Sequence, residues 1–173
     1  RGAAPRAFRP LDAYGPCAMI RPPAGRAAMT DRDSLRCVAE AYLLAAEAHV
    51  GHRRKGHAAE PYVNHIADVA ARLMRSPDAD EPTLLAAILH DLVEDTDRGL
   101  PEIGARFGPA VAAMVAEVTD DRSLPKAERR RRQAEEAPRK SPGARRIKLA
   151  DKASNLAALA TSPPADWSAE ELA

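Results

Sequence analysis

Aromatic residues are scarce in this sequence, at 3% of 173 residues, although hydrophobic residues of all kinds make up 45%. A core must therefore be built from Ala, Leu, Val and Ile, which suit close-packed helices better than a sheet rich in Tyr, Phe and Trp. The length leaves room for one domain with one sizeable core. Together these features argue against an all-β fold and against two domains.

Cysteine and net charge are also low. Two cysteines, Cys17 and Cys37, cannot make a disulfide framework or a four-thiolate zinc site, so a reducing cytoplasm is the expected location. Lys and Arg total 26 against 25 acidic residues, and the chain lacks the broad positive field of a dedicated DNA-binding protein. No uncharged stretch approaches the ~20 residues that cross a bilayer. We therefore expect a protein that binds neither DNA nor a membrane.

The first 28 residues lack the periodicity of a regular element. They hold five Arg and five Pro, with no period of 2 or 3.6 residues. Met29 stands just before Thr30, a favourable helix N-cap, so residues 1–28 are either a disordered extension or sequence upstream of the true start. An Arg-rich transit peptide is the weaker alternative, because no amphipathic pattern is present. We expect the folded domain to occupy residues 29–173.

Apolar residues recur at spacings of three and four from Thr30 onward, the period of an amphipathic helix. The segment from Thr83 to Val93 is apolar almost all round, which is typical of a central buried helix. No alternating strand pattern and no internal repeat is found, so the sequence predicts an all-α helical bundle. Helical faces are expected over residues 35–49, 61–73, 83–93, 111–118 and 147–159.

The central apolar segment carries polar side chains where burial is expected. His90 and Asp91 follow the run of Leu and Ile, and Glu94 and Asp95 follow one turn later. Burying unpaired carboxylates costs several kcal/mol, so these groups need a cation or a polar network. A metal ion would meet that need.

Two more helices place a polar residue inside an apolar face. His65 interrupts the face of the second helix, and Asp151 that of the last, with Asn155 one turn further on. Two imidazoles and two carboxylates without a thiolate suit Mn²⁺, Fe²⁺, Mg²⁺ or Zn²⁺ and leave positions for water and substrate. The pattern therefore predicts a mixed nitrogen and oxygen metal site.

Each of these residues also has an ordinary structural explanation. A lone histidine such as His65 is more often a satisfied core residue than a ligand. Asp151 stands beside Lys152 and three residues after Lys148, so a helix ion pair would also explain it. The remaining histidines are expected on the surface or in loops, outside the metal site: His49, His52 and His57.

Three segments together resemble a known family. They read PYVNH at residues 61–65, LHDLVEDT at 89–96 and KLADKASNL at 148–156. In this order they resemble the signatures of the His-Asp (HD) superfamily hydrolases, and more narrowly the hydrolase domain of RelA/SpoT proteins and the stand-alone small alarmone hydrolases of the metazoan SpoT homologue type. The resemblance runs from about residue 35 to about residue 168.

The resemblance implies hydrolysis of the 3′-pyrophosphate of guanosine tetra- or pentaphosphate, giving GDP or GTP and pyrophosphate. It also implies an HD-type helical bundle with one divalent metal ion, typically Mn²⁺. Arg54 would stack on the base and Lys55 would contact the base or the phosphates. The implied site residues are His65, His90, Asp91 and Asp151 for the metal, Glu94 and Asp95 for catalysis, and Arg54, Lys55 and Asn155 for the nucleotide.

The sequence departs from the family pattern in several places. Residues 56–60 replace the usual Asp- and Gly-containing loop, Ile66 stands where Pro is common, and Ser154 stands where an aromatic residue is common. The chain also ends before the terminal helices with which similar proteins close the bundle, so we expect the 29–173 domain to be shortened there. Rival functions are another nucleotide phosphohydrolase, such as an NADPH 2′-phosphatase, and an inactive regulatory remnant.

The stretch from Lys126 to Lys148 is the most basic part of the chain. For most of its side chains a solvated helix face is the expected role, while one or two would attract a polyanionic nucleotide into the cleft. An RNA-binding module is the non-enzymatic rival that this run suggests. The neutral charge balance and the scarce aromatic residues argue against it.

Overall fold

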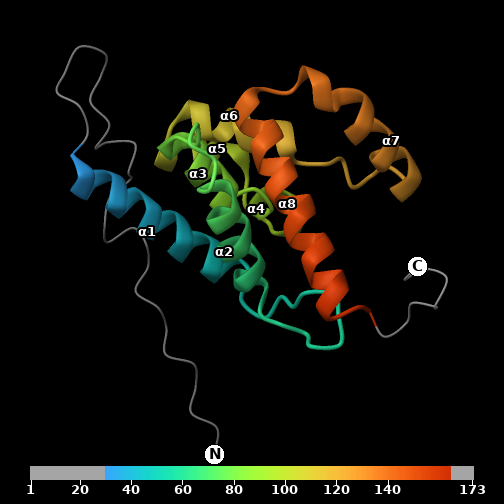
Figure 1. Ribbon diagram of the computed structural model, residues 1–173. Helices are drawn as coiled ribbons and strands as arrows, with labels where there is room; N and C mark the ends of the chain where they lie inside the picture. Colours follow the sequence, from blue (N-terminus) through green and yellow to red (C-terminus); the bar gives the residue numbers. More distant parts are fainter. Residues whose placement is uncertain (1–29, 165–173) are drawn as a thin grey trace, which may run out of the picture.

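The computed structural model describes residues 30–164, which form helices around one core (Figure 1). In this part of the chain no strand is present beyond an isolated bridge between Arg53 and Pro61, so the all-α prediction is confirmed. None of its helices is long and apolar enough to cross a membrane. The prediction for residues 1–28 lies outside the described residues. The elements in chain order are α1 (Asp31–Ala48), α2 (Tyr62–Leu73), α3 (Glu81–Ile88), α4 (Leu92–Asp95), α5 (Leu100–Phe107), α6 (Pro109–Val118), α7 (Lys126–Glu136), the 3-10 helix η3 (Ala137–Arg139) and α8 (Pro142–Thr161).

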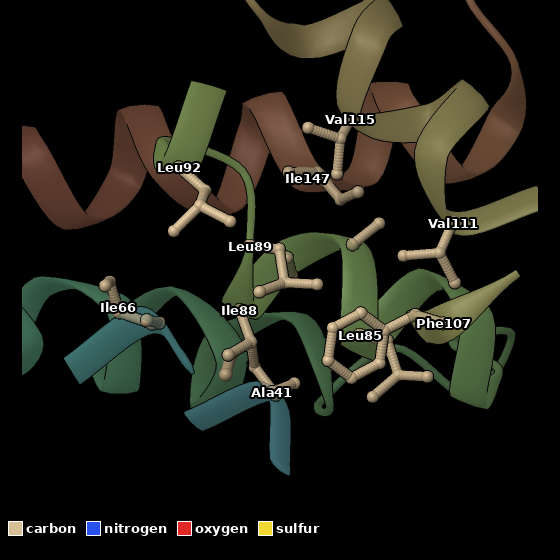
Figure 2. Close-up of a cluster of buried hydrophobic side chains, with 14 of the residues drawn as sticks. Ala41, Ile66, Leu85, Ile88, Leu89, Leu92, Phe107, Val111, Val115 and Ile147 are labelled. Atoms are coloured by element: carbon tan, nitrogen blue, oxygen red, sulfur yellow. The ribbon is translucent and has the colours of Figure 1, made fainter. Parts of the chain in front are cut away.

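Helix α3 lies at the centre of the bundle, as its almost uniformly apolar sequence predicts. It packs against α1, α2, α6 and α8. In Figure 2, Leu85 and Ile88 of α3 lie among side chains from the surrounding helices, including Phe107 of α5 and Ile147 of α8. These residues are buried, and burying one such side chain stabilises the fold by ~1.5–3 kcal/mol. The core therefore fixes the position of the polar residues that follow α3.

The prediction of one continuous helix over residues 83–93 is wrong at one point. Helix α3 ends at Ile88, a turn follows, and α4 begins at Leu92. Nδ1 of His90 donates to the carbonyl of Ala87 at 2.8 Å, and in a continuing helix that carbonyl would accept from the N–H four residues on. The break places the His-Asp pair in a turn and sets the acidic pair on a new helical turn.

The structure also corrects the prediction for His49, which was expected on the surface or in a loop. This residue is the C-cap of α1 and is only 4% exposed. Its ring stacks on Tyr62, with ring centroids 4.8 Å apart and planes inclined by 26°. His52 and His57 are exposed as predicted.

Two leucines predicted on apolar faces point to solvent instead. Leu35 is 70% exposed and Leu156 is 67% exposed, because each lies on the side of its helix that faces away from the core. Helix α5, which no predicted face covers, buries Ile103 and Phe107. Helix α7 has no buried residue, as expected for a solvated basic face.

Candidate metal centre and nucleotide cleft

The polar residues that the sequence singles out gather at one cleft of about 1080 Å³. Its lining comes from α2, α4, α7 and α8 and from the loops that precede α2 and α7. Four segments far apart in the chain therefore meet at one place. The predicted residues that line the cleft are Arg54, Lys55, His65, Asp91, Glu94, Asp95, Asp151 and Asn155.

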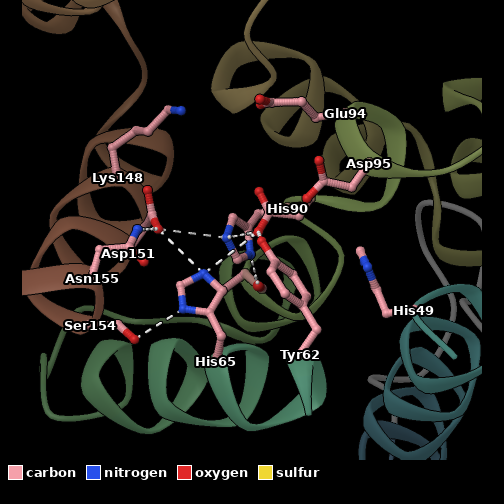
Figure 3. A network of polar contacts seen from close by, with 12 residues as sticks. His49, Tyr62, His65, His90, Glu94, Asp95, Lys148, Asp151, Ser154 and Asn155 are labelled. Atoms are coloured by element: carbon pink, nitrogen blue, oxygen red, sulfur yellow. Dashed lines mark hydrogen bonds and ion pairs between the residues drawn. The ribbon is translucent and has the colours of Figure 1, made fainter. Parts of the chain in front are cut away.

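The four predicted metal ligands converge beside this cleft, and Figure 3 labels three of them: His65, His90 and Asp151. Ligand atoms of His65, His90 and Asp151 all lie within 4.8 Å of one another. Nε2 of His90 is 2.9 Å from Oδ2 of Asp91. Nε2 of His65 is 3.5 Å from the same oxygen and 3.4 Å from Oδ1 of Asp151. Both imidazoles therefore turn Nε2 toward the two carboxylates.

A contact at Nδ1 orients each imidazole ring. Nδ1 of His90 donates to the carbonyl of Ala87, and Nδ1 of His65 lies 3.0 Å from Oγ of Ser154. Nε2 of His90 is buried and makes no hydrogen bond within the described residues, since its contact with Asp91 lacks hydrogen-bond geometry. Leaving a buried polar atom unsatisfied costs ~1–3 kcal/mol. A metal ion at this point would satisfy it, so these residues fit a divalent cation.

The charges of the cluster are strongly coupled. Burial alone would raise the pKa of Asp91, but His90 and His65 hold it well below its ordinary value. The pKa of Asp151 is lowered against burial chiefly by its contact with His65. Burial opposes a charge on the imidazoles as well, yet Asp91 raises the pKa of His90 to about 9, and Asp151 raises that of His65. The carboxylates and the imidazoles thus favour each other's charged forms, and a divalent cation bound here would take the place of imidazole protons.

Tyr62 is a residue of this site that the sequence reasoning missed. Its hydroxyl donates to Oδ2 of Asp91 at 2.6 Å. Burial and the neighbouring Asp91 raise the pKa of Tyr62, so the hydroxyl keeps its proton and fixes the carboxylate. The only sequence signal was its place in the PYVNH segment, three residues before the predicted ligand His65 on the same helix.

The acidic pair lies on α4, at the edge of the cluster. Arg122, from the loop before α7, contacts both carboxylates: its Nε is 3.3 Å from Oε1 of Glu94, and its Nη2 contacts Oδ1 of Asp95. The backbone N–H of Asp120 donates to Oε2 of Glu94 at 3.3 Å. Both carboxylates therefore face the cleft in defined positions.

A third group of contacts joins the metal cluster to the loop before α2. Nη2 of Arg54 donates to the carbonyl of Ser154 at 3.2 Å and to Oδ1 of Asn155 at 3.4 Å. Nδ2 of Asn155 in turn donates to Oδ1 of Asp151 at 2.6 Å. The neighbouring Lys55 is exposed and lines the cleft. Predicted ligand and nucleotide residues are thus one connected set.

The basic stretch contributes to the cleft at its two ends. Lys126 and Lys148 line it, whereas the four consecutive arginines of α7 do not. The ion-pair alternative for Asp151 does not hold in the described residues. Nζ of Lys148 lies 3.6 Å from Oδ1 of Asp120, and Nζ of Lys152 donates to Oε1 of Gln133 at 2.9 Å.

Comparisons with known proteins agree with this geometry. Residues 41–172 match the family model of the HD domain. The chain is 48% identical over 130 residues to the mouse (Mus musculus) guanosine-3′,5′-bis(diphosphate) 3′-pyrophosphohydrolase MESH1, a match that covers 75% of this chain and 73% of that protein. It is 35% identical over 103 residues to the bifunctional (p)ppGpp synthase/hydrolase SpoT of Escherichia coli K12, covering 60% of this chain and 14% of SpoT.

Solved structures give the same result. A metazoan orthologue of SpoT that hydrolyses ppGpp superimposes with a TM-score of 0.74 at 44% identity, covering 79% of this chain and 77% of that one. A Listeria monocytogenes protein superimposes with a TM-score of 0.54 at 32% identity, covering 62% of this chain and 67% of its own.

Proposed function

The chain belongs to the HD domain family, and from that premise we propose that it is a metal-dependent guanosine-3′,5′-bis(diphosphate) 3′-pyrophosphohydrolase. It hydrolyses guanosine tetraphosphate (ppGpp) or pentaphosphate to GDP or GTP and pyrophosphate. The observation that carries the proposal is the convergence of two imidazoles and two carboxylates beside a cleft that also holds an acidic pair and a basic pair. The proposed place of action is the cytoplasm, in line with the low cysteine content.

In this proposal His65, His90, Asp91 and Asp151 hold one divalent ion, with Mn²⁺ as the assigned metal. The unsatisfied Nε2 of His90 and a donor set of nitrogen and oxygen without sulfur support the assignment. A divalent ion at this place supplies positive charge against the diphosphate and lowers the pKa of bound water toward neutrality. The protein's part is to hold the four side chains in position.

Glu94 and Asp95 are assigned the proton transfers. The oxygen of a water molecule bonds to the phosphorus attached to the ribose 3′ oxygen, and the bond between that phosphorus and the 3′ oxygen breaks. One carboxylate of the pair takes the proton from the water, and the leaving 3′ oxygen receives a proton from the same pair. Their place on the turn after Asp91 supports this role, because both face the cleft beside the metal cluster.

Arg54, Lys55 and Asn155 are assigned to the nucleotide. A guanidinium group can stack on a purine ring, and an ammonium group pairs with phosphate as a point charge. The cleft of about 1080 Å³ lies at the upper end of the volumes of ligand sites and is large enough for a nucleotide with two diphosphates. The contacts of Arg54 with α8 support a fixed distance between base and metal.

An assay on a panel of nucleotides tests the proposal. With Mn²⁺ present, the purified protein should release pyrophosphate from ppGpp and leave GDP and GTP intact, and a chelator should stop the reaction. His90→Ala, checked for folding by circular dichroism, should lose both the metal and the activity. Release of phosphate from NADPH with ppGpp left untouched would replace this proposal with the phosphatase alternative.

A further inference from the structure

The loop before α2 carries two of the residues that are proposed to bind the nucleotide, Arg54 and Lys55. It comprises residues 52–61, which lie between α1 and α2 and are not helical. Figure 1 shows this loop alongside the last turn of α8. The two segments line a cavity of about 270 Å³, and Arg54 and Lys55 line it too. Contacts between the loop and α8 therefore set the position of both basic residues.

The two ends of the loop are joined to each other by backbone hydrogen bonds. The N–H of Arg54 donates to the carbonyl of Glu60 at 2.9 Å, and the N–H of Tyr62 donates to the carbonyl of His52 at 3.0 Å. With the isolated bridge described above, these bonds form a short antiparallel base for the loop. They close the loop on itself and leave the position of its tip to other contacts.

The tip of the loop is joined to the end of α8 through Ser162, the C-cap of that helix. The N–H of Ala58 donates to Oγ of Ser162 at 3.0 Å, and Nδ1 of His57 lies 3.3 Å from the same oxygen. The N–H of His57 donates to the carbonyl of Pro163 at 3.3 Å. A Cβ on Gly56 would clash with the carbonyl oxygen of Ser162, so the two backbones are in close contact. One hydroxyl thus contacts two residues of the tip.

Arg54 supplies a second connection between the loop and α8. Its Nη2 donates to the carbonyl of Ser154 and to Oδ1 of Asn155, about two turns before Ser162 on the same helix. A loop attached at one point can turn about that point, whereas attachment at two points along a helix also fixes its direction. Loss of the Ser162 hydroxyl would therefore leave Arg54 and Lys55 less well ordered.

We propose that Ser162 is a positioning residue that holds the loop before α2 against the end of α8 and so orders Arg54 and Lys55 for the nucleotide. The inference rests on the proposed function, which assigns these two residues to the nucleotide. Ser162 lies outside the lining of the main cleft, so it acts through the loop. A loop that is ordered before the ligand arrives loses less conformational freedom on binding, which increases affinity.

Steady-state kinetics with ppGpp and Mn²⁺ test this role. Ser162→Ala should raise KM by about 3- to 10-fold, the effect of losing one hydrogen bond of ordinary strength. Its kcat and its Mn²⁺ affinity should stay at the wild-type values, because the contact lies away from the metal cluster and the reacting bond. A wild-type KM in Ser162→Ala, or a loss confined to kcat, would contradict the proposal.

Ser34→Ala is the matched control for this substitution. It also removes one serine hydroxyl that connects two helices, since Oγ of Ser34 on α1 donates to Oε2 of Glu81 on α3 at 2.7 Å. Neither residue lines the main cleft or the smaller cavity. The KM of Ser34→Ala should equal that of the wild type, and circular dichroism should show that both serine variants keep their fold.

A mutant cycle separates positioning from a merely structural role. Calorimetric titration with GDP measures nucleotide binding without turnover, and Ser162→Ala should weaken this binding by the same factor of about 3 to 10. In the Arg54→Ala background the same substitution should have a smaller effect, because the group that Ser162 orders is gone. A contact with no positioning role would cost an equal factor in both backgrounds, and that result would overturn the proposal.

The role of Ser162 and the proposed function can fail separately. A wild type that binds GDP but leaves ppGpp intact refutes the function, while the GDP affinities of the variants still decide the role of Ser162. A wild type that hydrolyses ppGpp together with a Ser162→Ala variant of unchanged KM supports the function and refutes the positioning role. A wild type that neither hydrolyses ppGpp nor binds GDP overturns both.

Discussion

Replacing the acidic pair should separate the chemical step from metal binding. Glu94 and Asp95 lie on the one-turn helix α4, three and four residues after Asp91. Glu94→Gln and Asp95→Asn keep the shape of each side chain but remove its charge and its ability to take a proton. We expect each variant to keep its fold and its Mn²⁺ and to lose turnover of ppGpp by about 10²- to 10⁴-fold.

Each substitution also breaks an ion pair with Arg122, and the structure limits how much of the loss in turnover this could cause. A 10²- to 10⁴-fold fall in kcat corresponds to about 3–5 kcal/mol in activation free energy. The ion-pair partner of both acids, Arg122, has a side chain that is 56% exposed, and exposed ion pairs contribute about 0–1 kcal/mol. In Glu94→Gln the amide oxygen still accepts from the N–H of Asp120. A broken ion pair therefore accounts for less than about tenfold.

Arg122→Gln is the matched control for this experiment. It removes both ion pairs and leaves both carboxylates in place, so its kcat should stay within about tenfold of the wild type. Steady-state kinetics with ppGpp and metal analysis of each purified variant supply the measurements. Near-wild-type turnover in both acid variants, or an equally deep loss in Arg122→Gln, would refute the assignment of the proton transfers.

Three further changes test other parts of the site and fold. Arg54→Ala should raise KM for ppGpp more than it lowers kcat, because stacking far from the reacting phosphorus binds ground and transition states alike; steady-state kinetics measure both. Gly56→Ala should also raise KM without lowering metal content in elemental analysis. A Cβ at this position would clash with the carbonyl oxygen of Ser162, and φ is +145°, so the loop that lines the cleft would have to shift. Asp80→Ala removes the N-cap of α3, where Asp80 accepts from the N–H of Thr83 at 2.9 Å. It should lower the free energy of unfolding by ~1 kcal/mol, measured by urea titration at neutral pH. Hydrogen bonds from Thr83 hold the pKa of Asp80 below its ordinary value, so this difference should be lost as the pH falls through the folded-state pKa.

The composition and the apolar periodicity predicted the fold class because both reflect the core directly. A core without many aromatic side chains packs as helices, and the all-apolar segment before His90 is the central helix. The same logic located His65 and Asp151, since a polar residue inside an apolar face needs a partner. The sequence could thus identify residues that interrupt a pattern.

Features that depend on contacts between distant segments could not be predicted in this way. The break after Ile88 arises because a side chain takes a backbone carbonyl, and periodicity carries no trace of it. His49 is buried because Tyr62, from another helix, stacks on it. Such contacts depend on which helices pack against each other.

Under the proposed function, the contacts of Asn155 would help the enzyme to distinguish ppGpp from GDP and GTP. Asn155 lies one turn after Asp151 on α8, donates to that carboxylate at 2.6 Å and accepts from Arg54 at 3.4 Å. Helix α8 therefore sets the distance between the metal cluster and the group proposed to hold the base. With the base anchored at Arg54, a ribose bearing a 3′-diphosphate can place that group at the metal cluster, whereas 5′-phosphates alone extend from another carbon of the sugar. The distance between Arg54 and the metal cluster would then select the 3′-diphosphate, because a metal ion by itself would bind a 3′- or a 5′-diphosphate.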